Sequence, residues 1–176
     1  MLDLVDKGLV TDQVVLTVGY DIDNLTNPDI RRKYKGEVTT DRYGRQVPKH
    51  AHGTANLSRA TSSTRLITEA VMELYDRIVN PNLLIRRLNL TANHVVSEQS
   101  AQKKETYEQL TLFTDYEDRE QQRRAEETEL EKEKKMQQAV LDIKKKFGKN
   151  AILKGMNFEE GATTIQRNSQ IGGHRA

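Results

Sequence analysis

The sequence contains no cysteine and no tryptophan, and aromatic residues make up only 5% of its 176 positions. Without cysteine there is no disulfide scaffold, no thiolate zinc site and no cysteine nucleophile, and this composition suits a reducing compartment. No apolar run approaches the roughly 18 to 20 residues that span a bilayer. Residues 1–10 also lack the basic and apolar regions of a secretory signal. We therefore expect a soluble, cytoplasmic protein.

Charge is distributed unevenly along the chain, although the net charge is only +2. Residues 31–65 carry nine Lys or Arg against two acidic residues, whereas residues 101–133 carry eleven acidic residues against six basic ones. With 35% hydrophobic and 31% charged residues, we expect one modest core and several polar segments. A dense basic block beside folded sequence indicates a surface for a polyanion, and a solvated basic loop is the alternative.

The first part of the chain predicts an α+β domain with a small antiparallel sheet and one or two helices, covering residues 1–96. Residues 14–20 (VVLTVGY) are typical of a buried strand, and residues 53–61 alternate weakly as a second strand. Residues 28–52 form a basic excursion between these strands. Apolar residues at steps of three and four after Thr64 predict a helix of about 16 residues, and residues 83–96 predict a further strand. Residues 1–10 resemble the end of a helix.

The second part of the chain is charged and has no comparable apolar pattern. We expect a polar linker at 97–115, a charged helix at 116–148 ending at Gly148, and a flexible extended tail at 149–176. At 1.5 Å per residue the helix would be roughly 48 Å long. A short apolar stripe in this helix consists of Met136, Val140, Ile143 and Phe147. It permits an alternative function, a helical adaptor that binds a protein partner.

An apolar island interrupts the linker at residues 109–113 (QLTLF). It has no periodic apolar neighbours against which to pack, so it is typical of a short peptide ligand that becomes ordered on binding. A local anchor to the preceding domain is the alternative. The pattern is similar to the Gln-Leu-x-Leu-Phe motif that binds the bacterial sliding clamp, and Gln109, Leu110, Leu112 and Phe113 occupy its specified positions.

The domain before this island resembles the little finger domain of Y-family translesion DNA polymerases, in the ImpB/MucB/SamB and UmuC-like group. The resemblance lies in VVLTVGYD, HGTANLSRATSSTRLITEAVMELYDRI and LLIRRLNLT, and the tail FGKNAILKG with GATTIQRNSQIGGHRA adds to it. It implies a role in DNA-damage bypass, DNA repair and the SOS response. It also implies sequence-independent binding to the DNA backbone and a partner in the sliding clamp.

The resemblance begins after the family's catalytic palm, and the little finger's first strand and most of its first helix are expected upstream of Met1. We therefore predict no catalytic residue and no cofactor in this chain, and expect Mg²⁺ only in a catalytic core missing from it. Such a core, supplied by the missing N-terminal region, would be a further partner. The chain alone is not expected to polymerise DNA.

The candidate DNA-binding residues are basic or hydroxyl-bearing. Main-chain N–H groups and hydroxyls at a helix start suit phosphate, and arginines add charge. Strand alternation predicts that only one of Arg86 and Arg87 faces DNA, and that the other pairs with Asp76 or Glu73. The candidates are Ser58, Arg59, Thr61, Ser62, Ser63, Arg86, Arg87, Arg42, Arg45 and Lys49.

Two patterns invite a metal hypothesis and do not sustain it. His50 and His52 alternate as they would on one side of a strand, but no carboxylate cluster lies near them in the sequence. Asp21 and Asp23 follow a predicted strand, where a turn explains them better than a Mg²⁺ site does. We therefore predict no metal site.

Overall fold

The computed structural model describes residues 1–101, 116–171 and 174–175. The chain forms two compact units. One contains Met1 and the chain from Lys7 through the sheet; the other contains Leu2–Asp6 together with the long helix and the residues that follow it. Across the described residues, no helix combines the length and the apolar character that crossing a membrane requires.

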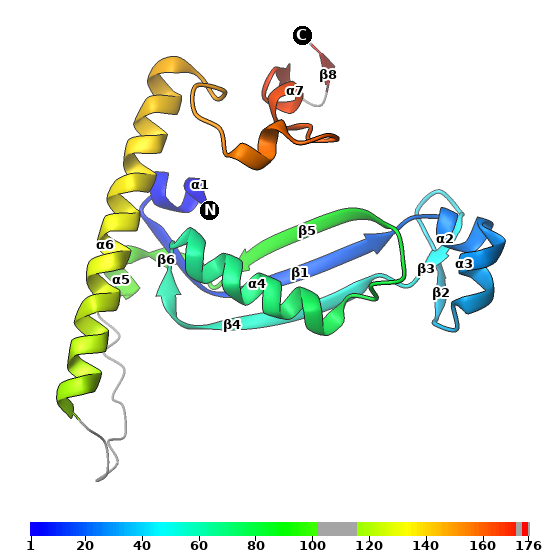
Figure 1. Ribbon diagram of the computed structural model, residues 1–176, viewed down its shortest axis with the longest axis horizontal. Helices are drawn as coiled ribbons and strands as arrows, with labels where there is room; N and C mark the ends of the chain where they lie inside the picture. The colour runs from blue at the N-terminus through cyan, green and yellow to red at the C-terminus, as the bar shows by residue number, and fades with distance from the viewer. Residues whose placement is uncertain (102–115, 172–173, 176) are drawn as a thin grey trace. The chain divides into compact units, whose positions relative to one another are not determined.

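The first unit is built on an antiparallel sheet in which β1 (Leu9–Tyr20) is the central strand (Figure 1). Strand β4 (Ala51–Thr61) pairs with one edge of β1, and β5 (Ile85–Asn93) pairs with the other. A short strand, β6 (Val96–Ser97), pairs with the start of β1 and leads into α5 (Glu98–Ala101). The predicted α+β class and antiparallel sheet are confirmed.

Helix α4 (Thr64–Ile78) covers one face of this sheet (Figure 1). Alternate residues of β1, from Leu16 through Val18 to Tyr20, are buried on that face with Leu74 of α4 and Leu83. Burying such side chains stabilises the unit by roughly 1.5–3 kcal/mol each. The opposite face of the sheet, which we call the open face, carries the intervening residues of β1 and is not covered by α4.

A glycine lets α4 approach the sheet closely. Gly53 of β4 lies opposite Leu16, and a Cβ atom there would be 2.9 Å from Leu74 Cδ1 and 3.1 Å from Ile78 Cγ2. Both distances are shorter than ordinary van der Waals contact. A larger residue at this position would require the Leu74 and Ile78 side chains to shift.

The basic excursion between β1 and β4 is folded. It contains α2 (Asp23–Thr26), α3 (Pro28–Lys33) and a hairpin of β2 (Val38–Thr40) with β3 (Gln46–Pro48), gathered at one end of the sheet (Figure 1). Asn27 caps α3 by accepting from the Asp29 N–H at 2.9 Å. The segment predicted as a loop therefore presents its basic residues on a defined scaffold.

A buried asparagine ties this insertion to the sheet. Asn24 is fully buried, and its Nδ2 donates to the main-chain oxygens of Asp21 (2.8 Å) and Leu84 (2.9 Å). Its Oδ1 accepts from the Leu84 N–H at 2.7 Å. One side chain thus fixes the end of β1 against the residue that precedes β5.

The second unit is dominated by α6 (Tyr116–Phe147), whose bounds match the predicted helix. Gly148 follows it at φ +94° and its N–H donates to the Lys144 carbonyl, which confirms the predicted end. Helix α1 (Leu2–Asp6) packs on α6, although the sequence predicts residues 1–96 as one domain. Of the predicted stripe, Met136 and Phe147 are exposed and Val140 and Ile143 are half-buried, whereas Leu141 is buried.

The tail beyond α6 is not uniformly extended. It contains a 3-10 helix, η1 (Gly155–Phe158), a short helix, α7 (Thr164–Asn168), and a pair of two-residue strands, β7 (Gln170–Ile171) and β8 (His174–Arg175). Asn150 links the start of the tail to α7, because its Oδ1 accepts from Asn168 Nδ2 at 2.6 Å and its Nδ2 donates to the Ile165 carbonyl.

Replacing Asn24 by Ala should lower the free energy of unfolding by about 2–3 kcal/mol, because buried main-chain groups of Asp21 and Leu84 would lose their partners. Urea denaturation followed by circular dichroism measures the change. Asn82→Ala is the matched control, since Asn82 is exposed, and it should stay within about 0.5 kcal/mol of the unmodified protein. Equal stabilities of the two variants would show that the buried network contributes little.

Candidate nucleic-acid interface

A cleft of about 550 Å³ lies between the β2–β3 hairpin and the open face of the sheet. Four arginines line it, Arg42 and Arg45 from the hairpin and Arg86 and Arg87 from β5. They are far apart in the sequence, and they meet because the hairpin folds over the end of the sheet at which β5 begins. The structure therefore brings four of the predicted DNA-binding residues into one site.

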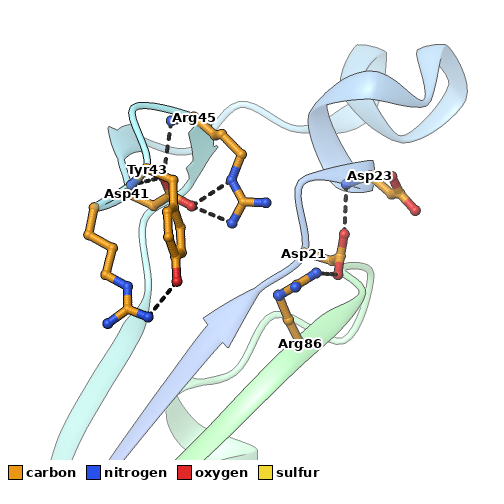
Figure 2. A network of polar contacts seen from close by, with 7 residues as sticks. Asp21, Asp23, Asp41, Tyr43, Arg45 and Arg86 are labelled. Carbon is orange, nitrogen blue, oxygen red and sulfur yellow. Dashed lines mark hydrogen bonds and ion pairs between the residues drawn. The ribbon is translucent and has the colours of Figure 1, made fainter.

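Asp41 holds Arg45 and the turn of the hairpin. Its Oδ2 accepts from Arg45 Nε at 2.9 Å and Nη2 at 2.7 Å, while its Oδ1 accepts from the N–H groups of Tyr43 (2.8 Å) and Arg45 (3.0 Å) (Figure 2). The hydrogen bonds from the Arg45 side chain are the main reason that the pKa of Asp41 is lowered. The carboxylate is thus charged at neutral pH and fixes the arginine in one orientation.

Asp21 holds Arg86 in a similar way. Arg86 Nη1 donates to Asp21 Oδ2 at 3.2 Å, and the Asp23 N–H donates to Asp21 Oδ1 at 3.0 Å (Figure 2). The bond from Asp23 is the largest cause of the lowered pKa of Asp21, and Arg86 adds to it. Asp21 and Asp23 therefore form a turn at the end of β1, as their sequence context indicates.

A register shift in β5 places both arginines of the pair in the cleft. Gly19 lies opposite Arg87, but Tyr20 lies opposite Ile85, so Arg86 is the extra residue of a bulge. Regular alternation is interrupted there, and both side chains line the same cleft. The prediction that one of them faces away and pairs with Asp76 or Glu73 is wrong, because Arg86 pairs with Asp21.

The other two arginines have no carboxylate partner among the described residues. Arg42 donates to the Tyr43 hydroxyl, and Arg87 makes neither an ion pair nor a side-chain hydrogen bond within the part of the chain that the structure describes. The cleft thus combines two arginines fixed by carboxylates with two that have no carboxylate partner among the described residues. Such a site favours a ligand that carries several negative charges.

The open face of the sheet continues from the cleft and carries no acidic residue at its paired positions from Gln13 to Gly19. Amide and hydroxyl groups cover it instead. Gln13 Nε2 donates to Asn56 Oδ1 at 2.9 Å, and Asn93 Nδ2 donates to Gln13 Oε1 at 3.0 Å, so an amide row crosses three strands. The paired side chains of the flanking strands on this face are His52, Thr54, Asn56, Arg87, Asn89, Thr91 and Asn93.

The remaining predicted residues of β4 and α4 lie at the other end of β4, roughly 30 Å away at 3.3 Å per residue. Thr61 and Ser63 are buried where α4 begins: Thr61 Oγ1 accepts from the Ser63 N–H at 3.0 Å, and Ser63 caps α4 by accepting from the Leu66 N–H at 3.2 Å. Arg59 lines a small hollow beside α4 together with Glu69 and Glu73. Ser58 is exposed and Ser62 is half-buried.

The structure also places Lys49 and the two histidines of the metal hypothesis, His50 and His52. Lys49 forms an exposed ion pair with Glu37 at 2.6 Å, at the base of the hairpin. His50 lines the cleft and His52 contacts Thr17 Oγ1 at 2.9 Å. Within the described residues no three His, Asp or Glu side chains are close enough together to hold a metal ion. The clamp-binding residues at 109–113 lie outside the described residues.

Sequence reasoning missed Tyr43, Asp41 and Asn24 as parts of this site. A signal for the first two exists, because Asp41-Arg42-Tyr43-Gly44 lies between short β-prone segments, as is typical of a hairpin turn containing Gly. Gly44 indeed takes φ +76°. No local signal marks Asn24, since its partner Leu84 is distant in the sequence.

Replacing Arg45 by Ala should raise the pKa of Asp41 toward its ordinary value, because the guanidinium hydrogen bonds that favour the carboxylate are lost. A carbon-detected NMR titration of the Asp41 carboxyl measures the shift, and Arg42→Ala should leave it unchanged. The lowered pKa also means that Asp41 stabilises the fold above pH about 3.8. Its contribution is lost as the pH falls through the lowered folded-state pKa. If the pKa of Asp41 is the same in the Arg45→Ala and Arg42→Ala variants, Arg45 is not the cause of the lowered pKa.

Comparison with known proteins identifies the family of this chain. Residues 2–112 match the impB/mucB/samB family C-terminal domain. Searches of curated proteins and of solved structures gave no significant match. The matched region is more than half of the chain and includes the sheet, α4 and the arginine-lined cleft. It confirms the resemblance to the C-terminal part of a Y-family DNA polymerase, a family of DNA repair and translesion synthesis whose domain implies DNA binding. The chain belongs to the impB/mucB/samB family.

Proposed function

We propose that this chain is a DNA-binding and clamp-tethering module of a lesion-bypass polymerase that acts in DNA repair and the SOS response. The observation that carries the proposal is the cleft in which Arg42, Arg45, Arg86 and Arg87 converge. Phosphates of the DNA backbone are its ligands. Because the contacts are to phosphate, binding is independent of base sequence.

The arrangement of charges supports a backbone ligand. Arg45 and Arg86 are fixed by carboxylates and offer donors in a set geometry, while Arg87 lacks such a partner among the described residues and gains one from a phosphate. Each phosphate that is neutralised releases counterions from the DNA, so affinity falls steeply as salt rises.

The open face of the sheet extends this surface away from the cleft. Its paired positions from Gln13 to Gly19 carry no carboxylate, so a polyanion lying along these positions is not repelled by them. Thr54, Asn56 and Thr91 are exposed there and can donate hydrogen bonds to phosphate or sugar oxygens. Of the serines and threonines at the far end of β4, the exposed Ser58 and the half-buried Ser62 fit a DNA contact better than Thr61 and Ser63, which are buried.

Residues 109–113 supply the tether in this proposal. Their sequence, QLTLF, fits the clamp-binding pattern and lies between the DNA-binding unit and α6. A linked peptide that holds the sliding clamp raises the effective concentration of the module at the primer end without any new contact to DNA. A modest affinity for the DNA and for the clamp is then enough to keep the module at the primer end. This chain carries out no chemical step. Nucleotidyl transfer, with its Mg²⁺, takes place in a polymerase core.

Replacing Arg87 by Ala should weaken binding to a primer–template duplex by about tenfold and reduce the salt-dependence slope by about one counterion. Fluorescence anisotropy of labelled DNA across a salt series measures both quantities. Arg65→Ala is the control, because it changes the net charge equally but lies on α4, which covers the opposite face of the sheet. Equal losses in both variants would show a general charge effect and reject the cleft as the site.

Replacing Leu112 and Phe113 together by Ala should weaken binding to a bacterial sliding clamp by roughly thirtyfold, since apolar anchors dominate such short peptides. Surface plasmon resonance with immobilised clamp measures the affinity. Thr111→Ala is the matched control, because position 111 is the unspecified one in the pattern. DNA affinity should be unchanged in all three proteins. If the double variant binds the clamp as the unmodified chain does, the tether is rejected.

A further inference from the structure

The turn of the β2–β3 hairpin displays an exposed aromatic ring. Tyr43 is 66% exposed, although it lies in a turn held by several hydrogen bonds. Its N–H donates to Asp41 Oδ1, the Gly44 N–H donates to the Asp41 carbonyl at 3.0 Å, and the Asp41 N–H donates to the Arg45 carbonyl at 2.9 Å. The ring is therefore held out in solvent by a rigid turn.

Two guanidinium groups lie against this ring. The Arg42 guanidinium carbon is 4.7 Å from the ring centroid and that of Arg45 is 5.1 Å from it. They differ in how they are held: Arg45 is fixed by Asp41, whereas Arg42 has no carboxylate partner among the described residues and donates to the Tyr43 hydroxyl. Arg42 can therefore leave the ring at little cost while Arg45 stays in place.

The ring is part of the same cleft as the arginines of β5. Tyr43, Arg87 and Asn89 all line it, so a strand whose phosphates reach Arg87 passes within reach of the hairpin. Phosphate-binding arginines beside an exposed aromatic ring are the two components of sites for single-stranded nucleic acid. A paired base inside a duplex offers no free face to such a ring, whereas an unpaired base does.

We propose that Tyr43 stacks on an unpaired nucleobase of a single strand that leaves the duplex bound in the cleft. Arg42 moves from the ring to the phosphate next to that base, and Arg45 supports the ring from its fixed position. This inference rests on the proposed function and deepens it, since it assigns single-stranded DNA next to a duplex as the ligand of the hairpin.

The test compares a blunt duplex with the same duplex carrying a single-stranded overhang. For the full chain, Tyr43→Ala should weaken binding to the overhang probe by about five- to thirtyfold and leave the blunt duplex within twofold. Tyr43→Phe keeps the ring and should bind both probes within twofold of the unmodified chain. With 2-aminopurine in the overhang, binding should quench its fluorescence in the unmodified and Phe proteins and not in the Ala protein.

The outcomes separate this inference from the proposed function. If Arg87→Ala weakens both probes while Tyr43→Ala weakens neither or weakens both equally, stacking is overturned and the DNA-binding cleft stands. If the chain binds neither probe at low salt, the proposed function fails and stacking fails with it. Tyr43→Ala leaves the hydrogen bonds of the turn intact, and circular dichroism confirms that the variants are folded.

Discussion

The alternation of side chains along β1 is the constraint on which the rest of the first unit depends. Leu16, Val18 and Tyr20 point to α4 and form the core, so Thr17 and Gly19 necessarily point to the open face. Because β1 pairs on both edges, its register also sets the faces of β4 and β5. The same alternation that buries apolar side chains on one face of the sheet therefore places mainly polar side chains on the other.

The cleft arises where this regularity is interrupted. The bulge at Arg86 turns a side chain that alternation would send to the α4 face into the cleft beside Arg87. Asn24 fixes the same region from inside, since it joins the end of β1 to Leu84 through three hydrogen bonds. The insertion therefore keeps a defined position over the sheet, and its arginines meet those of β5.

Sequence reasoning succeeded where the determinants are local and failed where they are distant. The bounds of α6 were predictable because residues 116–147 contain no Gly or Pro and are supported by pairs such as Arg124–Glu120. Strand β1 was found but begins at Leu9 and not at Val14, because Asp12 and Gln13 are polar and interrupt the apolar pattern. The bulge at Arg86 and the hydrogen bonds of Asn24 have no signature in the local sequence. The presence of both Arg86 and Arg87 in one cleft could therefore not be predicted.

The pairing of arginines with aspartates in the cleft has a cost and a benefit for binding an anion. Asp41 and Asp21 cancel part of the positive field, so the attraction comes mainly from Arg42 and Arg87. In return, Arg45 and Arg86 lose little conformational entropy when a phosphate binds, because their orientations are already fixed. A surface of this kind binds with modest affinity and defined geometry. In the proposed function that balance suits the module, because a peptide that holds it near the DNA would let it release and rebind.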